Sequence, residues 1–222
     1  MPERTYRAIL FDLDGTLIDN TASFHLAFER YCARYPDVLD RGNVTEREEL
    51  MQIYREKDRP AAYRRFCSWW EWKNAPDFQT FWQEWFSLYV HSAVPFPWTT
   101  EVLTRLRQHF LLGLITNGAG VHQHAKISSA GLAEYFSVII VSEDVGIAKP
   151  EPAVYRLCAD RLGVAPGDCL FVGDTPGSDI AGAAATGMDS LLVSGKEDER
   201  ATYTAENITY LKTLLDLEGK GI

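Results

Sequence analysis

Near its start the chain carries two carboxylates one residue apart, Asp12 and Asp14, within residues 11–16 (FDLDGT). They directly follow residues 6–10, an apolar run typical of a buried strand, and Gly15 interrupts that run. Alternate residues of an extended chain face the same side, so both side chains can enter one site. Ligands bind at the carboxyl ends of the strands in an open α/β sheet. The pair therefore predicts a ligand site at that edge.

Two neighbouring carboxylates repel each other. At about 5 Å and an effective dielectric constant of about 20, the cost is ~3 kcal/mol. A folded chain therefore needs a compensating cation or a shared proton at this place. An isolated pair of this kind also occurs in solvated turns at strand ends. The interpretation depends on whether the rest of the chain supplies positive charge and further metal ligands.

A second polar stretch follows the apolar residues 111–115 and consists of Thr116, Asn117 and Gly118. A hydroxyl and exposed backbone N–H groups at the start of a helix suit a phosphate oxygen. Taken alone, the same three residues are also an ordinary turn. These residues indicate a phosphate-binding site only in combination with the carboxylates.

A third stretch surrounds Lys149, which stands directly before Pro150. The proline keeps Lys149 out of helical geometry, and Pro152 suits the first turn of the next helix. A lone lysine is usually a solvated surface charge. The apolar neighbours and the flanking prolines instead indicate that Lys149 is held on a stiff loop just before a helix.

A fourth stretch, residues 171–179, carries Asp174 at the end of an apolar run and Asp179 at the start of the next predicted helix. Asp179 could be only a helix N-cap, whereas Asp174 has no such simple explanation. With the first pair, these residues make four carboxylates. One Mg²⁺ and Lys149 would bring the site near neutrality until phosphate arrives. Mg²⁺ prefers a few carboxylates, several waters and a substrate phosphate oxygen.

Composition limits the partners. The chain has 222 residues, enough for one domain of ordinary size and a smaller one. Its 46% hydrophobic content supports a real core. The formal net charge of −9 argues against nucleic acid or an anionic membrane as the main partner. A small phosphorylated substrate remains compatible if the site supplies its own positive charge.

The four cysteines are widely spaced and form no CxxC pair, which predicts reduced thiols in a cytoplasmic protein. No apolar run reaches the ~18 residues of a membrane span, and no signal peptide is visible. Nothing in the pattern distinguishes a monomer from a homodimer.

From residue 99 onward the pattern alternates between helix and strand. Predicted strands cover 111–115, 137–141, 169–172 and 190–193, and predicted helices cover 100–109, 121–130, 151–162, 179–186 and 209–217. This alternation predicts an α/β domain, a doubly wound parallel sheet covered on both faces. We expect residues 1–19 and 95–222 to form it.

Residues 20–94 contain no convincing strand and form an insertion after the first one. The predicted helices cover 20–35, 44–57, 60–73 and 77–90. The insertion is rich in large aromatics, namely Trp69, Trp70, Trp72, Phe78, Phe81, Trp82, Trp85, Phe86 and Tyr89. We expect most of them to form the core of a small helical bundle and a few to line a ligand pocket.

All four polar stretches, in this order at strand ends or loops, resemble the motifs of the haloacid dehalogenase-like (HAD) hydrolases. Residues 12–16 resemble the first motif, Thr116 the second, Lys149 the third, and residues 173–179 the fourth. The helical insertion resembles the cap of the phosphoglycolate-phosphatase branch. The resemblance covers the whole chain and implies a Rossmann-like core with that cap domain.

The resemblance implies roles for the first pair. Asp12 would be the nucleophile that forms an aspartyl-phosphate, and it would also bind Mg²⁺. Asp14 would be the general acid and base, and its backbone carbonyl would bind the metal.

For the later motifs, the resemblance implies that Asp174 binds the metal and that Asp179 supports metal waters or Lys149. Thr116 and the Asn117 amide would hold phosphoryl oxygens. Lys149 would offset charge on the nucleophile and on the phosphoryl group.

Three functions remain in view. The first is a Mg²⁺-dependent phosphatase of small metabolites such as phosphoglycolate, sugar phosphates or nucleoside monophosphates. The second is a phosphomutase of the β-phosphoglucomutase type, although His25 stands one residue beyond the place where that type carries a cap histidine. The third is a binding protein without activity. Dehalogenation is rejected because a halide leaves without an acid, whereas Asp14 is present.

Overall fold

The structure is a computed structural model that describes residues 6–35, 51–53, 58–69, 71–215 and 217. The chain divides into two compact units, Met1–Asn20 with Val94–Ile222, and Thr21–Ala93. Each division lies one residue from the expected boundary. The helix expected over 44–57 falls largely outside the described residues, and residues 51–53 of it are helical.

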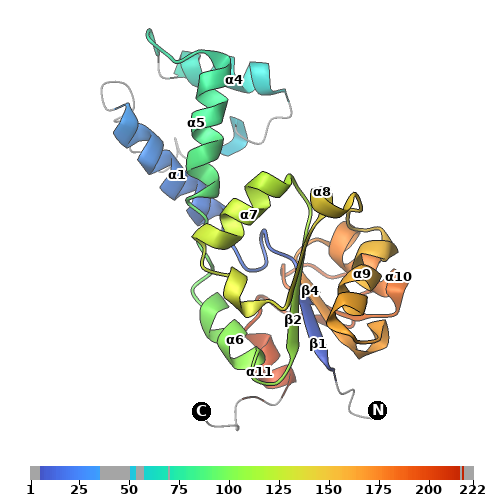
Figure 1. Ribbon diagram of the computed structural model, residues 1–222. Helices are drawn as coiled ribbons and strands as arrows, with labels where there is room; N and C mark the ends of the chain where they lie inside the picture. The colour runs from blue at the N-terminus through green and yellow to red at the C-terminus, as the bar shows by residue number, and fades with distance from the viewer. Residues whose placement is uncertain (1–5, 36–50, 54–57, 70, 216, 218–222) are drawn as a thin grey trace. The chain divides into compact units, whose positions relative to one another are not determined.

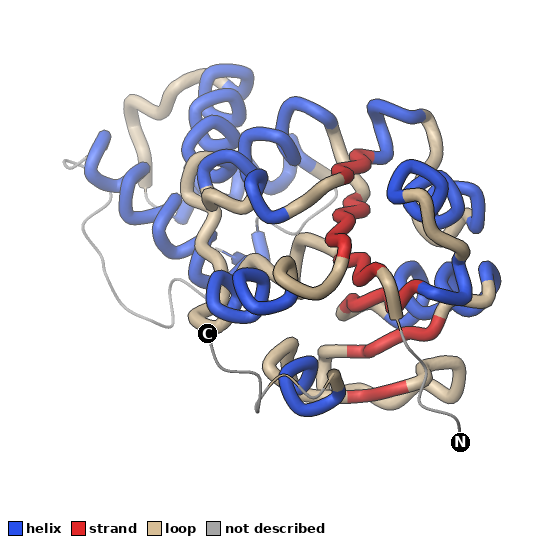
Figure 2. Tube along the Cα trace, turned by 60° about the horizontal axis from the view of Figure 1, so that its bottom comes forward, coloured by secondary structure: helices blue, strands red, loops and turns tan. Residues whose placement is uncertain are grey.

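The first unit is built on one six-stranded sheet in which every pairing is parallel (Figures 1 and 2). The strand order is β3-β2-β1-β4-β5-β6. The strands are β1 (Ala8–Phe11), β2 (Leu111–Thr116), β3 (Val138–Val141), β4 (Cys169–Gly173), β5 (Asp189–Leu192) and β6 (Tyr203–Thr204). This confirms the expected doubly wound parallel sheet. The expectation missed β6, because two residues are too few to show a period.

Helices cover both faces of the sheet, with α6, α7 and α11 on one and α9 and α10 on the other (Figure 1). The helices are α6 (Thr99–Leu106), α7 (Gly120–Ser129), α8 (Ser142–Val145), α9 (Pro152–Leu162), α10 (Ala181–Thr186) and α11 (Tyr210–Leu214). Short 3₁₀ turns occur at Ala133–Tyr135 and Pro166–Asp168, and a π turn at Pro176–Ile180 precedes α10. Because both faces are covered, all four residues of β1 are completely buried.

The strand order explains why one edge of the sheet collects the polar stretches. The chain leaves β1 toward β2 and β3 and then crosses back to β4 on the other side of β1. Phe11 of β1 is level with Leu114 and with Val172 of its two neighbours. The residues that follow these strands therefore meet at the topological switch point, where ligands bind in open α/β sheets.

The second unit is described as three helices, α1 (Asn20–Arg34), α4 (Arg59–Trp69) and α5 (Phe78–Val90), together with residues 51–53. Asp77 caps α5, because its side chain accepts hydrogen bonds from the backbone N–H groups of Gln79 (2.9 Å) and Thr80 (3.1 Å). All three agree with the helices expected from the sequence.

Aromatic side chains from these helices pack together, as expected. Tyr31 contacts Phe81 and Trp85 edge to face, with ring centroids 5.7 Å apart in both pairs. The cluster's buried members include Phe24, Phe28, Tyr31, Phe66, Trp72, Phe81, Trp82 and Trp85. Phe78 is an exception, because it is 37% exposed. Trp70 and the side chain of Trp69 lie outside the described residues.

All four cysteines lie within the described residues, and each is a free thiol. Within the same residues, every helix is too short or too polar to cross a membrane.

Candidate active site

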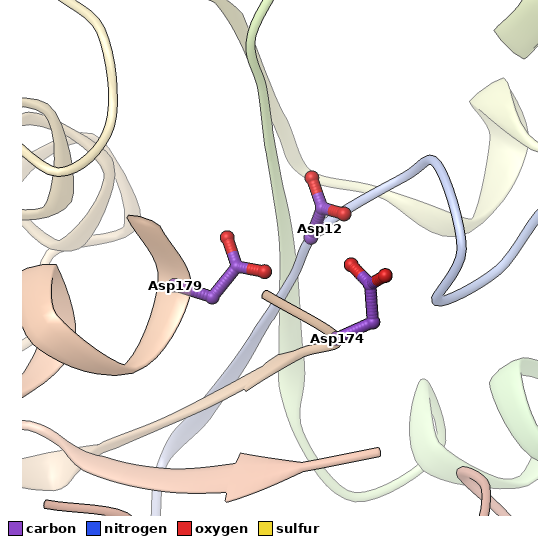
Figure 3. A group of neighbouring side chains, drawn as sticks. All are labelled: Asp12, Asp174 and Asp179. Atoms are coloured by element: carbon purple, nitrogen blue, oxygen red, sulfur yellow. The ribbon is translucent and has the colours of Figure 1, made fainter. Parts of the chain in front are cut away.

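Three carboxyl groups point toward one another at the switch point (Figure 3). They belong to Asp12 after β1, Asp174 after β4 and Asp179 in the π turn, and each offers an oxygen within 4.8 Å of the others. Asp12 and Asp179 are buried, and Asp174 is partly exposed. Three carboxylate oxygens so close together repel one another strongly unless a cation lies among them.

Two glycines permit this convergence. Gly15 has a positive φ of 86°, and a Cβ added there would lie 2.5 Å from Oδ2 of Asp174. A Cβ at Gly173 would lie 2.5 Å from the Cβ of Asp179. A side chain at either position would therefore displace a carboxylate of the cluster.

Lys149 supplies positive charge to the same cluster. Its Nζ donates hydrogen bonds to Oδ1 of Asp12 and, over 2.8 Å, to Oδ1 of Asp179. The other oxygen of Asp179 accepts from the backbone N–H of Thr175 at 2.9 Å. Lys149 is only 6% exposed, so it is a buried ion-pair partner and not a surface lysine.

Burial changes the pKa values of this cluster. Burial raises the pKa of Asp12 to about 7, against the opposing effect of Lys149. The pKa of Asp174 is raised by burial and by the charge of Asp179. Burial alone would lower the pKa of Lys149, but Asp12 and Asp179 outweigh it, and the net shift is upward. Lys149 therefore stays charged.

Asn117 fixes the position of the lysine. Its side-chain Nδ2 donates to the backbone oxygen of Lys149 at 2.9 Å, and its Oδ1 accepts from the backbone N–H of Lys149 at 2.9 Å. The side-chain amide thus ties the loop after β2 to the loop before α9. The side-chain amide of Asn117 therefore has a structural task of its own, separate from the phosphoryl-binding role expected for this residue.

Asp14 and Thr116 share a hydrogen-bond partner on helix α7. This helix contributes two residues to the site that were not predicted from the sequence. Nε2 of Gln123 donates to Oγ1 of Thr116 (2.5 Å) and to Oδ2 of Asp14 (2.9 Å). Nζ of Lys126 donates to both carboxylate oxygens of Asp14, at 2.9 and 3.0 Å. The spacing of three places Gln123 and Lys126 on one face of α7, and this was the only signal available in the sequence.

The charges show that a divalent cation fits. Four carboxylates, those of Asp12, Asp14, Asp174 and Asp179, face two ammonium groups, those of Lys126 and Lys149. One divalent cation would bring the formal charge to zero. Hard oxygen donors are the ligands that Mg²⁺ prefers. The residues present therefore fit a hard divalent cation, and Asp12, Asp174 and Asp179 could each offer it one carboxylate oxygen.

The chain therefore has a doubly wound parallel sheet with an acidic, lysine-bearing site at its switch point. The family model of haloacid dehalogenase-like hydrolases matches residues 6–187. That match takes in well over half of the chain, so the chain belongs to the haloacid dehalogenase-like hydrolase family. The resemblance based on the four motifs is confirmed.

Several curated proteins with similar sequences are phosphatases. A phosphoserine phosphatase from Thermus thermophilus is 40% identical over 87 residues, which are 39% of this chain and 35% of that protein. The chain thus matches about a third of that relative's length. A phosphoglycolate phosphatase from Yersinia pseudotuberculosis is 30% identical over 221 residues, covering 96% of this chain and 92% of that protein.

Solved structures share the fold. The HAD-hydrolase YfnB from Bacillus subtilis, in a form bound to magnesium, matches with a TM-score of 0.72 and 22% identity. The match covers 96% of this chain and 99% of that one. At this identity, the likeness concerns the fold alone.

Proposed function

We propose that the chain is a Mg²⁺-dependent phosphatase that hydrolyses small phosphomonoesters through an aspartyl-phosphate on Asp12. The observation that carries the proposal is the buried Asp12 carboxylate, which is paired with Lys149 and converges with Asp174 and Asp179 at the switch point. This arrangement provides an anionic nucleophile, a fixed positive charge and donors for a divalent cation at one edge of the sheet.

The reaction has two halves. In the first, a carboxylate oxygen of Asp12 attacks phosphorus, the bond from phosphorus to the leaving oxygen breaks, and Asp14 gives its proton to that oxygen. In the second, water attacks the phosphorus of the aspartyl-phosphate, and the carboxylate of Asp14 takes the proton of that water. Inorganic phosphate leaves, and Asp12 is a carboxylate again.

The remaining residues bind and orient. The Thr116 hydroxyl and the Asn117 backbone N–H hold phosphoryl oxygens, and Lys149 offsets the charge on Asp12 and on the phosphoryl group. Asp12, Asp174 and the backbone carbonyl of Asp14 would hold Mg²⁺. Once bound, the ion would neutralise charge on the phosphoryl oxygens. Asp179 keeps Lys149 in place, as their 2.8 Å contact supports.

The substrate belongs to the small phosphorylated metabolites, such as phosphoglycolate, sugar phosphates or nucleoside monophosphates. The phosphoserine and phosphoglycolate phosphatases among the relatives support this class. We assign residues 20–94 as the cap that selects the leaving group, because they are inserted directly after the first motif. Free thiols at all four cysteines support a cytoplasmic protein. We propose no nucleic-acid or membrane partner for this acidic chain.

Dehalogenation remains the rejected alternative. A halide leaves without a proton, so a dehalogenase needs no acid at Asp14. In this chain Asp14 is held by two side chains of α7, which supports a role in proton transfer.

Phosphate release from a panel of phosphomonoesters should depend on Mg²⁺. We expect EDTA to lower the rate at least ~100-fold, because the ion contributes several kcal/mol to the transition state in such sites. Adding excess Mg²⁺ back should restore the rate. Phosphate release at the same rate with and without EDTA would contradict the metal dependence. The absence of phosphate release from every ester would contradict the proposed phosphatase activity.

A phosphomutase is the second candidate, and one observation keeps it open. His25 lies on α1, and its ring Nε2 is buried without a hydrogen-bond partner among the described residues. Its ring contacts Phe24 edge to face, at 6.2 Å between centroids. His25 is half-buried, and its ring contact is with its neighbour in the chain, so an ordinary structural position within the second unit explains it.

His25→Ala should change phosphatase turnover less than about twofold, since the phosphatase reaction uses no proton from this ring. Steady-state kinetics on the best ester of the panel measure this. Loss of most turnover would favour the mutase, which interconversion of glucose 1-phosphate and glucose 6-phosphate would then test.

A further inference from the structure

Two side chains on one face of α7 hold the carboxylate of Asp14. Lys126 donates to both oxygens and Gln123 donates to Oδ2, all at 2.9–3.0 Å. Gln123 is 3% exposed, and the side chain of Lys126 is 12% exposed. A lysine on a helix ordinarily extends its ammonium into water. Here the ammonium is turned inward and donates two hydrogen bonds to the carboxylate of Asp14.

The same contacts orient Thr116. Nε2 of Gln123 lies 2.5 Å from Oγ1 of Thr116 and 2.9 Å from Oδ2 of Asp14. An amide nitrogen is a donor only, so the Thr116 oxygen must accept, and its own hydrogen can be donated to a phosphoryl oxygen. One side chain therefore sets the acid/base carboxylate and a phosphoryl-binding hydroxyl at a fixed separation.

The geometry distinguishes the two oxygens of Asp14. Each carboxylate oxygen has about two acceptor positions. Among the described residues, Oδ2 receives two donors, from Lys126 and Gln123, whereas Oδ1 receives one, from Lys126. The position that stays available for a water proton is on Oδ1.

We propose that Lys126 and Gln123 are positioning residues for the second half of the reaction, in which the ionised Asp14 accepts a proton from the attacking water at Oδ1. This inference rests on the proposed phosphatase function. Both side chains are donors, and therefore hold the carboxylate that remains after Asp14 has protonated the leaving oxygen. Because that carboxylate is already held in one orientation, no free side chain has to be ordered before water attacks.

The substrate 4-nitrophenyl phosphate separates the two halves, because nitrophenolate leaves without needing a proton. Lys126→Met keeps the length of the side chain and removes its charge. We expect it to lower kcat about 10- to 100-fold, a loss comparable to that seen when the hydrogen-bond partner of a metal ligand is removed. We expect kcat/KM, which reports formation of the aspartyl-phosphate, to stay within about threefold, so KM should fall together with kcat.

A direct readout accompanies the rate. In Lys126→Met, the first turnover should release nitrophenolate as a burst, and labelled phosphate should accumulate on the protein. Lys126→Arg, which keeps a cation, should recover most of the lost kcat. Gln123→Ala should lower kcat less than Lys126→Met does, but it should also lower kcat/KM, because the Thr116 hydroxyl loses its partner. Ser128→Ala, an exposed position on the same helix, is the matched control and should behave as wild type.

Three results would overturn the inference while leaving the phosphatase intact. These are a wild-type kcat in Lys126→Met, a parallel loss of kcat and kcat/KM, and a failure of Lys126→Arg to recover activity. If Lys126→Met fails to fold by thermal melting, Lys126→Gln, which also removes the charge from this position, carries the same test. If the wild-type protein hydrolyses no ester, or if Asp12→Asn remains active, the proposed function itself fails and this inference fails with it.

Discussion

Asp12→Asn should abolish phosphate release from every ester of the panel, by at least about 10⁴-fold, as expected when a covalent nucleophile is removed. An amide is a far weaker nucleophile than a carboxylate and does not form the acyl phosphate. The change also removes one of the three converging carboxylates and one partner of Lys149. The side chain keeps its shape, so the fold should persist.

Two measurements check this expectation. Phosphate release reports turnover, and rapid acid quench after addition of labelled substrate reports phosphate bound to the protein, which should vanish in Asp12→Asn. Asp160→Asn is the matched control, because it makes the same chemical change at an exposed position of α9. Turnover in Asp12→Asn above about one hundredth of wild type would assign the nucleophile to another group.

The second large effect is expected from Lys149→Met, which should lower both activity and stability. Lys149 is buried and bonds Asp12 and Asp179, so its removal leaves two buried carboxylates without their cation. Breaking a buried ion pair in this way costs about 3–5 kcal/mol of unfolding free energy. Turnover should fall at least ~100-fold, because the positive charge beside the proposed nucleophile, Asp12, is gone.

Denaturant unfolding measures the loss, and the metal gives a further test. Added Mg²⁺ should recover part of the stability of Lys149→Met, because a ligand that binds the folded state stabilises it. Lys212→Met is the matched control. It removes a lysine from the exposed contact with Glu101, at 2.8 Å, and should leave the free energy of unfolding close to that of the wild type, because water screens such a pair. Wild-type stability in Lys149→Met would mean that the carboxylates do not depend on this lysine.

The fold was predictable because its signals are local. Each strand of the sheet except β6 shows in the sequence as an apolar run, and β1 lacks alternation because both of its faces are covered. Helices and strands alternate at lengths that only a parallel sheet accommodates. The observed ends of the elements differ from the predicted ends by a few residues. For example, the helix predicted to end at residue 109 is α6, which ends at Leu106.

The meeting of the carboxylates was predictable for a related reason. Asp12 and Asp174 directly follow strands, and the carboxyl ends of parallel strands lie at one edge of the sheet. That rule does not say which strands are neighbours. The strand order placed β1 beside β4 and so brought the two side chains into one cluster with Asp179.

By itself, the sequence determined the fold class and the residue types that gather at one edge of the sheet, because strand periodicity and residue order are properties of the chain. Only the tertiary structure decided which polar and charged side chains are buried and which partners they bind. Lys126 on a helix predicts an exposed charge, and Asn117 predicts a turn. Packing of α7 against the sheet turned Lys126 onto Asp14, and the loop before α9 gave Asn117 its partner in Lys149. Such contacts depend on the orientation of whole elements, which no local pattern contains.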